Sequence, residues 1–389
     1  MEIAYNKIRI NPLKPMIAPG FATNNIATME VKGDLYLRYL RFKDDNQDVI
    51  YLVLDNLGVS YKIYQKFKTD LKALVNHNLE VIISCTHTHF APSLTRLFGL
   101  ADENYDYYDY VLKQAKQLIT ETPFITGDFM IDYRHQSFTD VGQSRLSHKA
   151  SNNVYSGVLS IYQDKKRLIN FLFYNCHPTI LEETPGYLTA EYPGLTIENL
   201  EAIYPDEFFV FIQGAAGDVS TRFTRTEKSF SEVKRLANLM SDQFNRLLKL
   251  PATKKPLSIG YQDYPLTLDY QVKKMQEIDT SQMSEKEIRE INTGKNTLKK
   301  LSELLPYYPR EIILTKLRLG KFTLVLSPFE MFSEYNEFIN RENTLIVTYS
   351  QGYITYLTGP NNDVLTYEAL MEMQTETDKT NIINILKND

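Results

Sequence analysis

The chain has 389 residues, enough to bury a substantial core, and its net charge of -5 with a pI near 5.8 gives no basic field for nucleic acid. No window approaches the roughly 18 uninterrupted apolar residues that a transmembrane span needs. The N-terminus, with acidic Glu2 and no apolar segment, does not resemble a secretory signal, and two cysteines do not make a disulfide scaffold. We therefore expect a cytoplasmic protein without nucleic-acid partners.

Strand and helix patterns alternate along the first half of the chain. The apolar runs 49–54 and 81–85 predict buried strands, and 61–76 predicts an amphipathic helix between them. A second helix is expected over 103–121. The middle of the chain predicts strands over 124–135, 154–163, 167–176 and 208–212, and a helix over 229–250 opened by a capping box of Ser229 and Glu232.

The last third begins with a Lys- and Glu-rich stretch over 271–304, which indicates a polar helical insertion, either a solvated helix or a lid. Strand pattern returns over 311–327. No Pro/Gly/Ser-rich linker or internal repeat divides the chain, so we expect one domain over 1–389. The predicted fold class is mixed α/β (α+β), with layered sheets flanked by helices and the active site at the C-terminal ends of strands.

Two of the six histidines stand together in Thr86-His87-Thr88-His89, directly after an apolar strand. Alternate residues of an extended strand share a face, so Cys85, His87 and His89 are predicted to point the same way. Paired imidazoles at the end of a buried strand favour a metal site or acid-base chemistry. The alternative is one histidine bonded in the core and one solvated, and Cys85 and Cys176 are also possible ligands or packing residues.

A third histidine has the same placement. In Asn175-Cys176-His177-Pro178, the proline cannot donate a ladder hydrogen bond, so the strand is expected to stop and leave His177 at its edge. After the next strand, the small residues around Gly214 and Gly217 allow close backbone approach or positive φ, and their amides could hold an oxyanion. Ser220 follows as a candidate nucleophile, although a tight turn with Asp218 as its capping residue is the alternative.

Acidic and tyrosine side chains complete the candidate set. Glu330 follows the strand pattern of 311–327 and could join two histidines around zinc. Alternatively, Glu330 or Glu334 could lie in the first turn of a helix that runs through Phe338. The tail from Tyr349 to Gly359 and the following Tyr367 are rich in tyrosine. Any single tyrosine among 27 is more often a packing residue than a catalytic one.

The order of these motifs resembles the catalytic domain of neutral (non-lysosomal) ceramidases over about residues 10–369. The motifs are Thr86-His87-Thr88-His89, Ser144-Arg145-Leu146-Ser147, Asn175-Cys176-His177-Pro178-Thr179, Gly217-Asp218-Val219-Ser220, Pro328-Phe329-Glu330 and the region of Tyr356 and Tyr367. The resemblance implies a zinc-dependent amidase with a role in lipid metabolism.

The resemblance also implies the roles of individual residues. The zinc ligands would be His87, His177, Glu330 and Tyr356, with Tyr353 a near competitor of Tyr356 because the spacing to Tyr367 is one residue shorter than is usual in the family. The substrate-facing residues would be His89 at the carbonyl, Arg145 at the polar head, Ser220 at the scissile bond and Tyr367 at the oxyanion. Either Ser220 or a zinc-bound water would be the nucleophile.

Departures from the family's sequence pattern widen the range of substrates that we expect. The chain is expected to lack the signal and the C-terminal immunoglobulin-like domain of secreted members, and Thr221-Arg222 stands where Pro-Asn is usual. We therefore expect a small-molecule N-acyl substrate, which is an N-acylated amine, a ceramide-like amino alcohol or an amino sugar. The alternatives are a non-catalytic relative that binds metal or ligand, and an esterase or phosphoesterase using the same zinc site.

Overall fold

The computed structural model describes residues 1–21, 24–96, 103–146, 153–272, 285–360 and 366–388, and it has the mixed α/β layering expected from the sequence. Its first sheet has the strand order β6-β5-β4-β1-β7. These strands are β1 (Glu2–Arg9), β4 (Tyr36–Lys43), β5 (Asp48–Leu54), β6 (Glu80–Cys85) and β7 (Ile125–Thr126). Strands β5 and β6 are parallel, and helix α1 (Tyr61–Leu74) connects them, as predicted.

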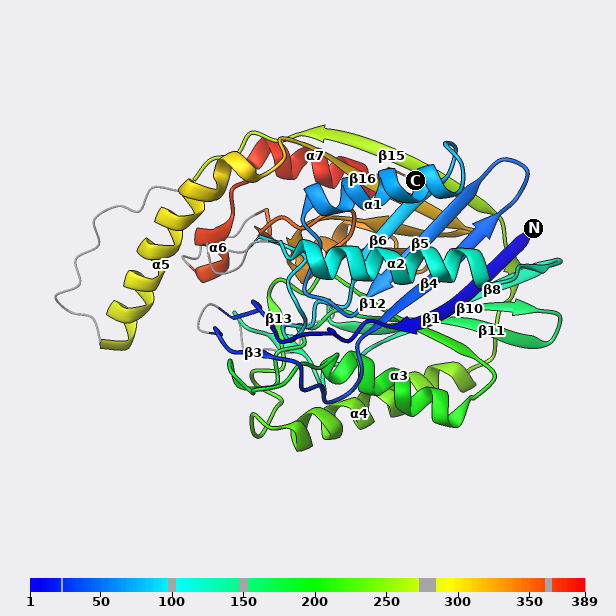
Figure 1. Ribbon diagram of the computed structural model, residues 1–389, viewed down its shortest axis with the longest axis horizontal. Coiled ribbons are helices and arrows are strands. Elements are labelled where there is room, and N and C mark those ends of the chain that lie inside the picture. The colour runs from blue at the N-terminus through cyan, green and yellow to red at the C-terminus, as the bar shows by residue number, and fades with distance from the viewer. Residues whose placement is uncertain (22–23, 97–102, 147–152, 273–284, 361–365, 389) are drawn as a thin grey trace.

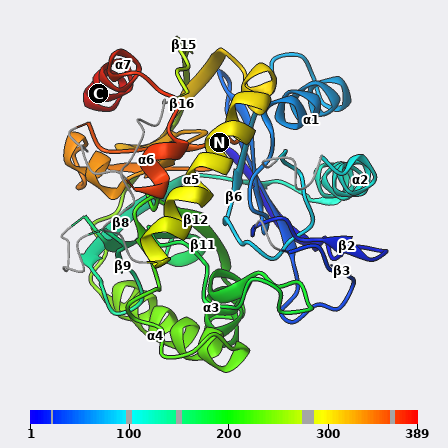
Figure 2. The same ribbon diagram turned by 90° about the vertical axis from the view of Figure 1, so that its left-hand side faces the viewer.

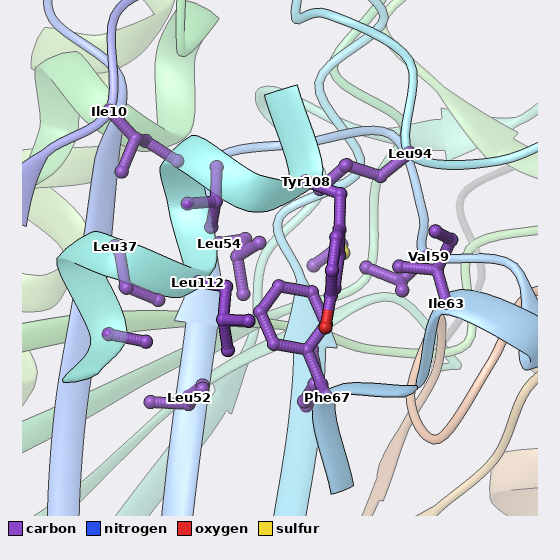
Figure 3. Packing of buried hydrophobic residues seen from close by; sticks show 14 of the residues in the cluster. Ile10, Leu37, Leu52, Leu54, Val59, Ile63, Phe67, Leu94, Tyr108 and Leu112 are labelled. Atoms are coloured by element: carbon purple, nitrogen blue, oxygen red, sulfur yellow. The ribbon is translucent and has the colours of Figure 1, made fainter. Parts of the chain in front are cut away.

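Two helices cover the outer face of this sheet, namely α1 and α2 (Tyr105–Glu121) (Figure 1). Alternate residues of β5 enter different cores because a strand presents opposite faces in turn. Leu52 and Leu54 pack with Ile63 and Phe67 of α1, as Figure 3 shows. Tyr51, one residue away, packs on the inner face against the other two large sheets. The sheet is therefore buried on both sides.

A second sheet has the order β12-β11-β10-β8-β14 and supports the second histidine motif. Its strands are β8 (Phe129–Ser137), β10 (Tyr155–Gln163), β11 (Lys166–Tyr174), β12 (Phe208–Gln213) and β14 (Lys255–Pro256). The segment expected as one strand over 124–135 is divided between β7 and β8, and Gly127 with φ 156° lies at the break. Helices α3 (Glu191–Ile203) and α4 (Phe230–Lys249) cover the outer face of this sheet.

The expected capping box of α4 forms only in half. Ser229 accepts a hydrogen bond from the amide of Glu232 at 3.2 Å, as an N-cap residue does. The Glu232 carboxylate does not return to Ser229 but accepts from the amide of Thr226 at 2.8 Å and pairs with Arg235. The nearby guanidinium and the amide of Thr226 therefore compete successfully for the carboxylate that the box would use.

A third sheet, β15-β16-β17-β19, carries the acidic motif. Its strands are β15 (Ile259–Thr267), β16 (Glu311–Leu319), β17 (Phe322–Leu326) and β19 (Thr344–Val347). The predicted strand over 311–327 is a hairpin, because Gly320 with φ 62° makes a turn between β16 and β17. Polar helix α5 (Glu285–Leu304) crosses the face of the molecule that is turned to the viewer in Figure 2, and residues 273–284 of the expected insertion lie outside the described residues.

Short elements complete the chain. They are β2 (Met16–Ile17), β3 (Ala27–Thr28), β9 (Gln143–Ser144), β13 (Val219–Ser220), η1 (Leu305–Tyr307), β18 (Glu330–Met331), η2 (Ser333–Phe338), β20 (Tyr356–Leu357), α6 (Tyr367–Met371) and α7 (Glu376–Lys387). The three large sheets share one apolar cluster. None of the helices within the described ranges is long and apolar enough to cross a membrane.

Candidate functional site

The histidine pair leaves the end of β6 by a left-handed turn. His87 has φ 65°, so the prediction that Cys85, His87 and His89 share one face of an extended strand is wrong. The amide of Thr86 still bonds to the carbonyl of Leu54 on β5 at 3.0 Å, and the chain leaves the extended conformation at His87. Both imidazoles still reach one place, and their ring centroids are 5.0 Å apart.

His177 and Ser220 are held side by side by main-chain pairing. Strand β11 ends at Tyr174, before Pro178, as expected. His177 forms a bridge with Ser220 of β13, and its amide donates to the carbonyl of Val219 at 3.0 Å. Ser220 is buried. The topology therefore brings the candidate nucleophile to the candidate metal ligand from a segment more than forty positions away in the numbering.

Glu330 and Tyr356 are also neighbours in the structure. They are register partners in the parallel pairing of β18 with β20, so their side chains leave the same face of this small sheet. The alternative placement in the first turn of a helix is wrong for Glu330, because the short helix η2 begins only at Ser333, and it is right for Glu334, which lies in the first turn of η2. Glu330 is instead buried, with 3% of its surface exposed.

The three imidazoles of His87, His89 and His177 converge, with ligand atoms that all lie within 4.8 Å of one another. Each ring is oriented by a main-chain carbonyl that receives its Nδ1 proton. The acceptors are Leu57 for His87, Gly20 for His89 and Ala216 for His177, each at 2.7 Å. A carbonyl only accepts, so each Nδ1 carries the proton and each Nε2 offers a lone pair.

The Nε2 atoms of His177 and His87 face a carboxylate. Oε2 of Glu330 lies 3.0 Å from Nε2 of His177 and 3.7 Å from Nε2 of His87. Two acceptors at such a distance repel each other unless a proton or cation lies between them. The Nε2 atoms of His87 and His89 are buried and have no hydrogen-bond partner among the described residues. This donor set fits a divalent metal that prefers imidazole and carboxylate ligands.

The electrostatics of the site keep the histidines neutral. Burial lowers the pKa of His89 to about 3, reinforced by nearby His177, and burial together with the Arg145 cation lowers the pKa of His177 to about 3. The pKa of His87 is also lowered well below its usual value by burial. Neutral imidazole is the form that binds metal.

Arg145, Tyr356 and Tyr367 lie beside this cluster. The Arg145 guanidinium donates to the carbonyl of Gly217, pairs with Glu368 at 3.0 Å and lies 5.9 Å from the centre of the Tyr356 ring. Tyr367 opens α6 with its ring centroid 6.1 Å from that of Tyr356. Burial opposes the charge on Arg145, but Tyr356 and Glu368 raise its pKa above the usual value, so it stays cationic.

Two tyrosines contact the cluster more directly than the sequence indicated. The Tyr349 ring stacks on His87 with centroids 3.7 Å apart and planes at 15°. The hydroxyl of Tyr353 donates to Oε1 of Glu330, whereas the other carboxylate oxygen, Oε2, is the one nearest His87 and His177. The tyrosine-rich tail signalled this region. It did not show which rings would contact the histidines, because Tyr349 reaches His87 through a left-handed turn of its own, with φ 53°.

The glycine loop after β12 is tightly packed. A Cβ on Gly217 would lie 2.6 Å from the carbonyl oxygen of Glu330, so this glycine allows close approach to the main chain of β18, and the expected positive φ is not present. The amide of Gly217 bonds to the carbonyl of Met331 at 2.7 Å and is therefore already engaged rather than facing an oxyanion. Asp218 accepts from Ser333.

Cys85 and Cys176 do not belong to the ligand cluster. Both are free thiols buried in apolar clusters, and burial raises the pKa of each. They are packing residues, which was one of the two interpretations of the sequence.

Comparison with solved structures gives neutral ceramidases as structural neighbours. A ceramidase solved in complex with C2 has a TM-score of 0.80 and 11% identity, over 99% of this chain and 74% of that one. Neutral ceramidase from Pseudomonas aeruginosa has a TM-score of 0.78 and 11% identity, over 99% of this chain and 73% of that one. No family model and no curated protein matches the sequence. The expected resemblance is therefore confirmed in the fold, which is that of the neutral ceramidases.

Proposed function

We propose that this protein is a zinc-dependent hydrolase of a linear amide bond in an N-acylated amine. The observation that supports this most is the convergence of three neutral imidazoles, two of which, His87 and His177, face the buried carboxylate of Glu330. Zinc bound there would supply a Lewis acid for the amide carbonyl and a nucleophile at neutral pH. The proposed ligands are His87, His177, Glu330 and Tyr356.

The remaining residues would handle the substrate and its protons. Ser220, beside His177, would attack the carbonyl carbon or position the water that does. His89, neutral at pH 7 and with a lone pair on Nε2, would face the substrate carbonyl. Arg145 would orient the polar head, and Tyr367 would donate to the developing oxyanion.

The test compares His87→Ala and Ser220→Ala with wild type for zinc content and for hydrolysis of a panel of N-acyl amines. We expect His87→Ala to lose both, and Ser220→Ala to keep zinc while losing at least about 100-fold in kcat/KM. His77→Ala, which changes an exposed histidine elsewhere, is the matched control. If both site variants kept zinc content and activity, the proposal would be wrong.

The same protein preparations distinguish the alternative functions from the proposed amidase. A non-catalytic relative would bind zinc through His87 and hydrolyse none of the panel. An esterase or phosphoesterase would prefer the ester or phosphoester analogue of a substrate over the amide. Matched amide, ester and phosphoester substrates with one acyl chain expose either outcome.

A further inference from the structure

A hollow lies against Tyr353, whose hydroxyl contacts Glu330 of the candidate metal site. It encloses about 140 Å³ between the start of α1, the segment before α2 and the turn after α5. Four tyrosines contribute to its wall, together with hydroxyl, carboxylate and guanidinium side chains. We call it the tyrosine pocket and define it by Ser60, Tyr61, Arg96, Glu103, Tyr308 and Tyr353.

Tyr353 connects the tyrosine pocket to the site. Its ring lines the pocket, and its hydroxyl donates to Oε1 of Glu330. Tyr308 lines the same pocket and belongs to the segment that follows α5. A group bound in the pocket would therefore lie against the Tyr353 ring, whose hydroxyl contacts the carboxylate that faces His87 and His177.

The polar side chains of the pocket suit a ligand with several hydroxyl groups. Glu103 accepts from the hydroxyl of Ser60 at 3.0 Å and lies 4.0 Å from Nε of Arg96, whose guanidinium lies 4.3 Å from the centre of the Tyr307 ring. Carboxylate and guanidinium are planar groups with two atoms that can engage neighbouring hydroxyls at once.

One polar atom in the pocket still needs a partner. The hydroxyl of Tyr308 is buried and has no hydrogen-bond partner in the part of the chain that the structure describes. A buried hydroxyl without a partner is costly, and a ligand that supplies one removes that cost. Tyr308 follows η1 at the end of the polar segment that was expected as a solvated helix or a lid.

The size of the pocket limits what can enter it. Each water molecule needs about 10–15 Å³ of cavity volume, so the pocket has room for roughly ten water molecules. It therefore also has room for a ring compound with a similar number of atoms. The paired long chains of a lipid would not fit. Aromatic faces instead suit the C–H face of a sugar ring, whose hydroxyls meet the polar groups around it.

We infer that the tyrosine pocket binds a single pyranose ring and that the substrate of the neighbouring site is an N-acylated amino sugar. Only the second part of this inference, the identity of the substrate, rests on the proposed amide hydrolysis. Binding of the ring depends on Tyr308, Glu103 and the tyrosine faces, and needs no metal.

The test titrates N-acetylglucosamine into the full chain by calorimetry and measures release of acetate in parallel. Tyr308→Phe removes one hydroxyl, and we expect it to weaken sugar binding about five- to tenfold, as loss of one hydrogen bond does. Glu103→Gln should weaken binding without changing the pocket's shape. Tyr261→Phe, which removes another buried tyrosine hydroxyl outside the pocket, should stay within about twofold of wild type.

The outcomes separate this inference from the proposed function. Absence of sugar binding into the millimolar range, with hydrolysis of simple N-acyl amines intact, would overturn the sugar site and leave the amidase. Equal binding by wild type, Tyr308→Phe and Glu103→Gln would also overturn it. Sugar binding that depends on Tyr308, in a protein that hydrolyses no amide, would support the pocket and contradict the amidase.

Discussion

The three histidine rings are oriented by main-chain carbonyls rather than by acidic side chains. Leu57, Gly20 and Ala216 each fix one Nδ1, and these residues belong to three different segments of the chain. A hydrogen bond at Nδ1 fixes the tautomer of the ring and the direction in which the free Nε2 points. Gly20 cannot be substituted without disturbing its contact, because a Cβ there would lie 2.4 Å from the carbonyl oxygen of His89.

The assignment of Tyr356 or Tyr353 as metal ligand can be tested directly. Tyr356 is paired with Glu330 across β18 and β20. Burial and the Glu330 charge raise the pKa of Tyr356 well above its usual value, and the Arg145 cation offsets this only in part, so the phenol would ionise only with a bound metal. We expect zinc to produce the ultraviolet difference band of tyrosinate in wild type and in Tyr353→Phe, but not in Tyr356→Phe.

The two variants should also differ in zinc affinity. Tyr353 donates to Glu330 and acts through it, so Tyr353→Phe should weaken zinc binding about 10- to 100-fold, as outer partners do. Tyr356→Phe should weaken it more. A tyrosinate band that vanished only in Tyr353→Phe would assign the ligand to Tyr353 instead.

Glu191 predicts a pH dependence of stability that is separate from metal binding. It is fully buried at the start of α3, with φ 52°, and accepts from the amide of Ile180 at 2.5 Å. Burial raises its pKa to about 8. The folded state therefore holds this proton between about pH 4.5 and 8 while the unfolded state does not, and the stabilising contribution is lost as pH rises through that window.

The matched variant is Glu191→Gln, which keeps the shape and removes the titration. The unfolding free energy of wild type relative to Glu191→Gln should fall between pH 5 and 8 by up to about 1.4 kcal/mol per pH unit. Urea unfolding of the zinc-free proteins at several pH values measures this difference. A difference that stayed constant across the window would show that the carboxyl is ionised throughout.

At the scale of elements, the strands that end at the site could be predicted because their patterns are local. Apolar runs before His87 and His177 mark β6 and β11 without reference to the rest of the chain. The path after each strand could not be predicted, because the left-handed turns at His87 and Tyr349 depend on contacts with distant segments.

Two elements with sequences atypical of their secondary structure could not be predicted either. The pattern of β4 does not indicate a buried strand because it contains Arg38, which is neutralised by Asp55 at 2.8 Å across the fold. Helix α3 begins with Pro193 and Gly194 in its first turn, residues that usually argue against a helix interior. Proline is tolerated there because the first amides of a helix have no partner within it.

The contact between the glycine loop and β18 makes a prediction at this scale. Gly217→Ala would place a methyl group 2.6 Å from the Glu330 carbonyl oxygen, so β18 must move and carry the carboxylate with it. We expect about 2 kcal/mol or more of lost stability and at least tenfold weaker zinc binding. Gly260→Ala, where the nearest atom is Cβ of Arg318 at 3.3 Å on a partly exposed strand, is the control.

Urea unfolding and zinc titration of the two glycine variants check this prediction. Unchanged zinc affinity in Gly217→Ala would show that the loop adjusts without moving Glu330. The glycine would then serve only to pack the loop.

At the scale of the whole molecule, the site joins three sheets. His87 follows β6 of the first sheet, His177 follows β11 of the second, and Glu330 lies just after β17 of the third. These sheets already share one apolar cluster. A metal held by all three would therefore bind the folded chain but not the unfolded one, in which the ligands are far apart.

Zinc should consequently raise the thermal midpoint of the whole chain rather than of one part. Free zinc at 1,000 times its dissociation constant stabilises the folded state by about 4 kcal/mol. Calorimetry with zinc and with a chelator should show this shift in wild type and in His77→Ala, whereas His87→Ala should show none. A shift that persisted in His87→Ala would place the bound zinc elsewhere. A shift confined to one of several separate transitions would contradict a metal that holds the three sheets together.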